Sequence, residues 1–388
     1  MHDLTRCVQH PAVSQDGFKS LAVPTYRAST IVYDDPRDFA RRAERGLDGY
    51  TYGLHGTPTT RTLEVQLTAL HGGARTMLVP SGQAAVAITM LAVLKPGDKV
   101  LIPDHVYPPV RSLCAGYLAQ RGIVHQVYDP LIGGGIADLI DASTKLIWLE
   151  SPGSGTMEVQ DVPAIARAAQ ARGVLTGCDN TWASPLLFKP LAHGVDVAVE
   201  ALTKYVGGHS DLLLGSITVK DLGLRKAVKD VLGVLGIGVS PDEAALALRG
   251  IETMGVRMAH SGRVARDFAE RLQDVPAVAR VLHPALPSCP GHEVFLRDFK
   301  GASAVFSLVI KPEFTARIYP ALGQLRLFAI GASWGGTHSL IAPMDVAADR
   351  TMRPWNPAEG LVRLSIGLEE PGELWEDLSR FLDALVAG

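Results

Sequence analysis

The stretches VLTGCDNTW (174–182) and VDVAVEALTKY (195–205) decide the fold of this chain. Each begins as a short run of apolar and β-branched residues, which is typical of a strand. The first run reaches a charged residue at Asp179, and the second reaches one at Lys204. Continuous apolar strands separated by helices favour a mostly parallel sheet that is covered on both faces. Such sheets bind ligands at the carboxyl ends of their strands, so we expect Asp179 and Lys204 to share a ligand-binding edge.

Strand-like and helix-like segments alternate outward from these two runs. We predict strands at 76–79, 99–102, 123–128, 145–149 and up to 179, and helices at 84–94 and 162–172. Beyond about residue 250 the pattern changes, and we predict strands at 304–310 and 361–367 and an amphipathic helix at 373–387. The sequence therefore predicts an α/β protein with a second, smaller α+β domain.

The bulk composition bounds the class of protein. A chain of 388 residues, of which 47% are apolar and 20% charged, is long enough for two domains with large interiors. We predict an N-terminal arm that contacts a neighbouring subunit, a ligand-binding domain and a C-terminal α+β domain at 1–56, 57–249 and 250–388. The formal charge of −3 gives no electrostatic reason to expect nucleic acid or an anionic membrane as a partner.

The cysteines and the N-terminus indicate the compartment. Cys7, Cys114, Cys178 and Cys289 lie far apart with no C-x-x-C spacing, which argues against a disulfide framework or a zinc site. The histidines also lack ligand spacing, so we expect no catalytic metal. The chain has no apolar leader and no run long enough to span a bilayer, so we predict a cytoplasmic protein.

Lys204 and Asp179 together predict a bound pyridoxal phosphate. A low local dielectric favours a neutral lysine amine, which forms a Schiff base with an aldehyde. An acid keeps the ring nitrogen of the cofactor protonated, and Asp179 is placed for that role. Ser81 is the expected N-cap of the helix at 84–94. Between a strand and this helix start, Ser81, Gly82 and Gln83 offer free amides to a phosphate. The alternative is an ordinary surface lysine and a loop aspartate.

Three further residues extend this site. The Thr203 hydroxyl, beside the lysine, is placed to contact the same phosphate. Tyr107 follows a predicted strand and is placed to stack on a flat ring, although a lone tyrosine is more often a core residue. Arg363 is a charge in an otherwise apolar strand, so it needs an anionic partner, either a substrate carboxylate or a structural acid.

The chain resembles the pyridoxal-phosphate enzymes of cysteine and methionine metabolism over nearly its whole length. The resemblance is carried by YTYG (50–53), GTPT (56–59), DPLIG (129–133), LESPGS (149–154), TMEVQDVPAI (156–165), DNTW (179–182), ALTKY (201–205), GHSD (208–211), SWGG (333–336) and RLSIGLE (363–369). It implies a fold-type I, aminotransferase-like architecture with the cofactor at the carboxyl ends of the strands. It also implies a homo-oligomer, commonly a tetramer built as a dimer of dimers.

The resemblance assigns roles to matching positions. Lys204 is expected to be the catalytic Schiff-base lysine and Asp179 the partner of the ring nitrogen. Tyr52 is expected to reach the active site of the adjoining subunit, where it would bind the cofactor and take part in catalysis. Tyr107 is expected to be catalytic and to stack on the ring, and Gly82, Gln83 and Thr203 are expected to hold the phosphate. Arg363, Ser333 and Trp334 are expected to bind the substrate.

The chain departs from the family pattern at two places. Many members carry an arginine two residues after the tyrosine equivalent to Tyr52, where it binds the cofactor phosphate, but this chain has Leu54. His55 and Arg61 are the candidate substitutes. At Thr337-His338, relatives usually have an aromatic residue and a glutamate, so substrate preference is the property this departure affects.

Within the family, finer features resemble the β-lyase branch. Ser154 and Trp334 stand where many γ-enzymes carry an asparagine and a smaller apolar residue. The resemblance therefore implies a sulfur amino acid as substrate, with β-elimination of L-cystathionine to homocysteine, pyruvate and ammonia in methionine biosynthesis. A γ-lyase, a γ-synthase and a cysteine desulfhydrase are the alternatives. A non-catalytic cofactor-binding regulator is disfavoured because Lys204, Asp179 and Arg363 are all present, and a nicotinamide oxidoreductase because no G-x-G-x-x-G stands between a strand and a helix.

Overall fold

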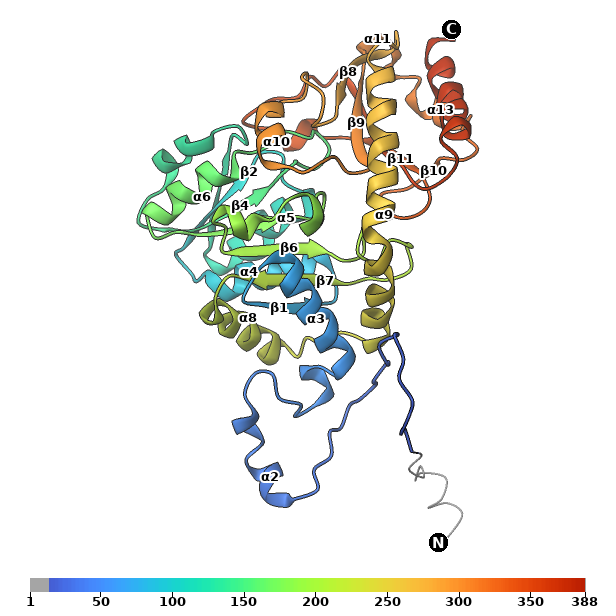
Figure 1. Ribbon diagram of the computed structural model, residues 1–388. Coiled ribbons are helices and arrows are strands. Elements are labelled where there is room, and N and C mark those ends of the chain that lie inside the picture. The colour runs from blue at the N-terminus through green and yellow to red at the C-terminus, as the bar shows by residue number, and fades with distance from the viewer. Residues whose placement is uncertain (1–13, 388) are drawn as a thin grey trace.

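The computed structural model describes residues 14–387 as two sheets with their helices, preceded by an extended arm (Figure 1). Cys7 and the first part of the predicted arm lie outside the described residues. The strands of the larger sheet are β1 (Arg75–Val79), β2 (Lys99–Pro103), β3 (Val124–Tyr128), β4 (Thr144–Glu150), β5 (Leu175–Asp179), β6 (Val197–Ala201) and β7 (Gly215–Val219). Their order in space is β1-β7-β6-β5-β4-β2-β3.

The larger sheet is mostly parallel, as the sequence predicts. The pairs from β3 through β2, β4 and β5 to β6 are parallel, whereas β7 pairs antiparallel with both β6 and β1. Its helices are α3 (Pro58–His71), α4 (Gly82–Val93), α5 (Pro108–Ser112), α6 (Val162–Ala171), α7 (Ser184–Leu187) and α8 (Leu222–Leu235). The parallel strands therefore direct their carboxyl ends to one edge, which is where Asp179 and Lys204 lie.

Side-chain caps start the helices at the positions that the sequence indicates. The Ser81 hydroxyl accepts a hydrogen bond from Ala84 N at 3.1 Å, so α4 begins directly after β1. Asp161 caps α6 in the same way through Ala164 N. Because α4 begins at the carboxyl edge of the sheet, its first amides are directed to the predicted ligand site.

The second sheet has the order β10-β11-β12-β9-β8. Its strands are β8 (Val278–Leu282), β9 (Val305–Ile310), β10 (Ala329–Ile330), β11 (Leu340–Met344) and β12 (Gly360–Ser365). The accompanying helices are α10 (His292–Asp298), α11 (Pro312–Thr315), α12 (Ile318–Leu322) and α13 (Pro371–Val386). The predicted strands at 304–310 and 361–367 correspond to β9 and β12, and the predicted helix at 373–387 to α13.

A long helix connects the two sheets. α9 (Pro241–Leu272) has 32 residues and runs beside both of them (Figure 1). The domain boundary predicted at residue 250 falls within this helix. One apolar cluster joins Leu202 and Tyr205, near the predicted catalytic lysine, to Met254 and Met258 of α9 and to Phe306 of β9. The two domains therefore share a continuous core, which gives the second domain a direct influence on the site.

The arm, with the short helix α2 (Pro36–Ala40), extends away from this body (Figure 1). Several of its apolar side chains are exposed, among them Phe18, Leu21 and Val32. The Arg27 guanidinium pairs with Asp242 at the start of α9. Within residues 14–387, no helix combines the length and the apolar composition needed to cross a bilayer.

Candidate active site

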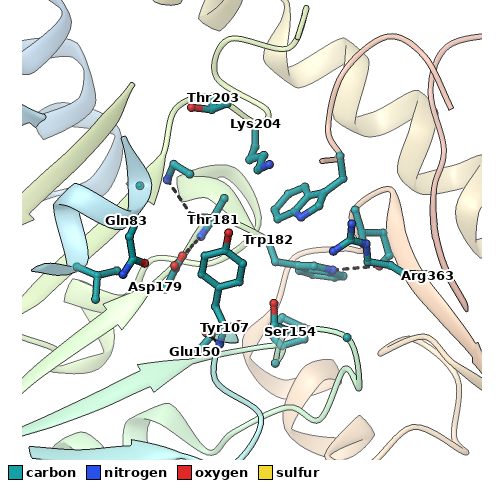
Figure 2. A pocket seen from close by; sticks show the side chains of 18 of the residues that line it. Gln83, Tyr107, Glu150, Ser154, Asp179, Thr181, Trp182, Thr203, Lys204 and Arg363 are labelled. Carbon is teal, nitrogen blue, oxygen red and sulfur yellow. Dashed lines mark hydrogen bonds between the residues drawn. The ribbon is translucent and has the colours of Figure 1, made fainter. Parts of the chain in front are cut away.

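A cavity of about 230 Å³ lies between the carboxyl edge of the larger sheet and the second sheet (Figure 2). The larger sheet and its loops contribute Ser81, Gly82, Gln83, Tyr107, Glu150, Ser154, Asp179, Thr181, Trp182, Thr203 and Lys204. The second domain contributes Val305, Ala332, Trp334 and Arg363. Most of the predicted site residues, although far apart in the sequence, are thus brought to one cavity.

Lys204 lies in the turn that follows β6. Its Nζ donates to Ser333 Oγ at 2.7 Å and is 5.3 Å from the centre of the Trp334 ring. Burial, with a smaller contribution from the positive charge of Arg363, lowers the pKa of the Lys204 amine to about 8. A substantial neutral fraction is therefore present near neutral pH, as a nucleophile or general base requires. Ser333, predicted to contact substrate, contacts this amine.

Asp179 is the last residue of β5. Its Oδ1 accepts the Thr181 N–H at 2.9 Å, and Thr181 Oγ1 accepts the Ala201 N–H at 2.9 Å. Burial raises the pKa of the Asp179 carboxyl, while its bonds to Thr181 and the charge of Lys204 oppose the increase. Thr181 thus ties the carboxylate to the strand that leads to the lysine, a role that the sequence did not indicate.

Glu150 is a residue of the cavity that the sequence analysis did not single out. It ends β4 and lies directly opposite Asp179 in the register of β4 and β5. Its Oε2 accepts the Tyr107 N–H at 2.8 Å. Burial, and then the charge of Asp179, raises the pKa of the Glu150 carboxyl to about 8, against hydrogen bonds from Tyr107 and Ser154. The available signal was an acid at the end of an apolar strand, the same signal that identified Asp179.

The start of α4 forms one end of the cavity. A Cβ on Gly82 would lie closer than 3.0 Å to the Ala201 Cβ, so only glycine fits here. The Gln83 Nε2 donates to Pro109 O at 3.1 Å, while its buried Oε1 has no partner among the described residues. The Thr203 hydroxyl exchanges hydrogen bonds with the backbone of Leu214. The free amides of α4 suit a phosphate.

Arg363 forms the opposite end. It is 8% exposed in β12, and its Nη2 donates to Ala332 O at 2.6 Å. No carboxylate within residues 14–387 forms an ion pair with it, and burial lowers its pKa. Tyr107 projects between this end and Asp179, and burial raises the pKa of its hydroxyl (Figure 2). A buried arginine without an acid is suited to a bound carboxylate.

Some predicted residues lie outside the cavity. Tyr52 is 48% exposed, and its hydroxyl lies 3.4 Å from Ser29 Oγ. Leu54 and His55 line a separate small cavity. Arg61 pairs with Glu64 at 2.5 Å and donates to His55 O at 2.6 Å. The two candidate substitutes for the missing arginine therefore lie away from the cavity.

Thr337 and His338, where the chain departs from the family pattern, lie outside the cavity. Thr337 Oγ1 lies 3.1 Å from His338 Nδ1, at a solvent-exposed position. In the described part of the chain, no group of three or more His, Cys, Asp or Glu side chains is arranged to hold a metal ion.

This donor set fits pyridoxal phosphate. An amine of lowered pKa, a buried carboxyl, a glycine-lined helix start and a ring-sized space beside Tyr107 meet in one cavity. The Cys/Met metabolism PLP-dependent enzyme family matches residues 4–383. The chain belongs to this family, and it is a pyridoxal-phosphate-dependent enzyme.

Three named proteins are similar to this chain over most of its length. A protein of Rhizobium johnstonii, named provisionally as a cystathionine beta-lyase, is 44% identical over 92% of this chain and 90% of its own. The cystathionine beta-lyase of Bordetella avium is 38% identical over 95% of this chain and 93% of its own. An L-alanine/L-glutamate racemase of Wolbachia pipientis is 36% identical over 94% and 93%.

A solved structure gives the same fold. The crystal structure of cystathionine gamma synthase from Xanthomonas oryzae pv. oryzae, in complex with cystathionine, superposes with a TM-score of 0.86. It is 30% identical and covers 95% of each chain. The predicted fold class and cofactor are thereby confirmed.

Proposed function

We propose that this enzyme cleaves the Cβ–S bond of L-cystathionine, so that cystathionine and water give homocysteine, pyruvate and ammonia. The carrying observation is the convergence of Lys204, Asp179 and the unpaired Arg363 on one cavity. The full-length similarity to cystathionine beta-lyases supports the choice of substrate. The reaction belongs to methionine biosynthesis and transsulfuration.

The side chains have separate tasks. Arg363 binds the α-carboxylate of the substrate and orients its Cα–H towards Lys204. The neutral amine of Lys204 takes the Cα proton and later donates a proton to the leaving sulfur. Asp179 keeps a proton on the ring nitrogen of the bound cofactor. Pyridoxal phosphate, when bound, supplies the sink for the electrons released at Cα.

Ser154 and Trp334 favour β-elimination over γ-chemistry. Ser154 hydrogen-bonds Glu150, and the centre of the Trp334 ring lies 5.3 Å from Lys204 Nζ, so both line the cavity in which the substrate would react. A γ-synthase or γ-lyase is the nearest alternative, since a gamma synthase shares the fold. A cysteine desulfhydrase would use the same elimination on a smaller thiol. A racemase would return the proton to Cα instead of breaking the Cβ–S bond.

We also propose a cytoplasmic homotetramer assembled as a dimer of dimers, in which Tyr52 enters the cavity of the adjoining subunit. The exposed apolar side chains of the arm support a protein partner for it, because such residues rarely remain exposed as a group. The same arrangement would carry Leu54 to the phosphate end of the neighbouring cavity, leaving that end dependent on neutral donors.

An assay of the purified protein with L-cystathionine tests the proposal, with identification of the keto acid and a record of the visible absorbance. Pyruvate with homocysteine is the expected product pair. Formation of 2-oxobutyrate with cysteine would move the enzyme to the γ-lyases. A protein that binds the cofactor but racemises L-alanine without releasing a keto acid would contradict the proposed β-elimination.

A further inference from the structure

The turn that carries the catalytic lysine, residues 202–208, packs directly on the backbone of α9. Within this lysine turn, Gly207 N donates to Leu202 O and Gly208 N to Lys204 O, both at 2.7 Å. A Cβ on Gly250 of α9 would lie closer than 3.0 Å to the carbonyl oxygens of Val206 and Gly207. The helix and the lysine turn are therefore in backbone contact, which only glycine at position 250 permits.

Arg257 reinforces this contact from two helical turns further along α9. It is 7% exposed, and its Nη2 donates to Tyr205 O at 2.8 Å and to Gly250 O at 2.7 Å. Its Nε donates to Thr253 Oγ1 at 3.0 Å. Gly208 has a φ of +72°, and a Cβ there would lie closer than 3.0 Å to the guanidinium. The turn and the arginine are thus fitted to each other.

The charge of Arg257 argues against a role in packing alone. No acid within residues 14–387 forms an ion pair with it, and burial lowers its pKa. A buried cation without a counter-charge is costly, and an apolar side chain of similar volume would fill the space at lower cost. What the guanidinium adds is a hydrogen bond to the carbonyl of Tyr205, the residue directly after Lys204.

Tyr205 is restrained from the second domain as well. Its hydroxyl accepts the Ala304 N–H at 2.9 Å, and its ring lies 5.5 Å from the Trp334 ring. Arg257 restrains the backbone of the same residue from α9. Since Lys204 is the preceding residue, these restraints determine where its side chain begins.

We propose that Arg257 is a positioning residue for the proposed reaction, holding the lysine turn against α9 so that Lys204 stays aimed into the cavity. The inference rests on the proposed function of Lys204. Nothing in the motifs or in the similarity to known proteins assigns a role to this arginine.

The test compares R257M, which removes the donors, with L272A, which opens the apolar core at the far end of the same helix, where Leu272 is fully buried. Both full-length holoenzymes are treated with hydroxylamine, and loss of the cofactor is followed by its visible absorbance. Because a loosened turn exposes the lysine linkage, we expect R257M to lose cofactor on the order of tenfold faster than wild type. L272A should lower the melting temperature without this change.

Kinetics with L-cystathionine provide the second readout. R257M should lower kcat by roughly tenfold to a hundredfold with little change in KM, because misplacing a reacting group affects the chemical step. R257K, which retains a cation able to reach one carbonyl, should restore part of the loss and also decides the question if R257M does not fold. If R257M is destabilised but loses its cofactor to hydroxylamine at the wild-type rate and keeps the wild-type kcat, the proposal is overturned. The hydroxylamine measurement uses no substrate, so it stands even if the natural substrate is not cystathionine.

Discussion

The two walls of the cavity carry opposite charges, and burial acts on both. On the carboxyl wall, formed by the ends of β4 and β5, burial raises the pKa of the Asp179 and Glu150 carboxyls. On the cation wall, formed by Lys204 in the turn after β6 and Arg363 in β12, burial lowers the pKa of both side chains. Burial therefore disfavours the charged forms on both walls until a partner of opposite charge binds.

The difference between the walls indicates what each one binds. The carboxyl wall suits a protonated ring nitrogen, which would supply the missing cation. The cation wall suits the substrate carboxylate at Arg363. The lowered pKa of the Lys204 amine suits it to accept a proton as a base. Because burial disfavours the charge on each wall until a partner binds, each wall selects a partner of opposite charge. Single substitutions on each wall should separate the two effects.

The largest effect is expected on the cation wall at Lys204. K204A removes the only side chain of the wall able to exchange a proton with Cα, so kcat should fall by roughly 10²- to 10⁴-fold or more, with loss of the cofactor's visible band. K226A on the exposed surface of α8 is the matched control and should retain full activity. A K204A protein with wild-type turnover would contradict the assignment of the base.

The next effect separates the two acids of the carboxyl wall. D179N removes the carboxyl proposed to pair with the ring nitrogen of the cofactor, so kcat should fall by about 10²- to 10³-fold, as when a preorganised electrostatic contact is lost. E150Q keeps an oxygen acceptor for the Tyr107 N–H, so its kcat should stay within a few-fold of wild type. Steady-state kinetics of both variants test the ranking, and an E150Q defect as large as that of D179N would reverse it.

A smaller effect is expected for substrate binding at Arg363. R363A loses the charge-assisted contact to the α-carboxylate, so kcat/KM should fall by roughly 10- to 150-fold, mainly through KM. R363K retains the charge but not the planar fork, so it should recover only part of the loss. Equal KM values for R363A and wild type would show that the carboxylate binds elsewhere.

Sequence reasoning predicted the elements whose physical signal is local. The apolar runs of β2, β4 and β5, the Ser81 cap and the charges that end two strands all lie within a few residues of what they determine. The roles of Glu150, Thr181 and Arg257 depend on contacts between distant segments, as in the approach of α9 to the lysine turn. Periodicity carries no information about such pairs, and it also did not reveal the 32-residue helix α9.

The smallest effect concerns the stability of the carboxyl wall as pH changes. The pKa of Glu150 is raised from 4.5 to about 8 in the folded protein, so the folded state binds the proton more tightly than the unfolded chain does. Its contribution to stability is therefore complete below pH 4.5 and is lost as the pH rises towards 8. The glutamine of E150Q does not titrate in this pH range, so this loss of stability is absent from the variant.

The melting temperature of cofactor-free E150Q, relative to wild type, should therefore increase by a few degrees between these two pH values and then level off. D179N serves as the control, because removing the neighbouring charge should bring the pKa of Glu150 down and flatten part of the wild-type slope. If the melting temperatures of wild type and E150Q change with pH in parallel across this range, Glu150 is ionised in the folded protein. The carboxyl wall would then hold the negative charge of Glu150 despite its burial, and a bound cation would be needed to explain it.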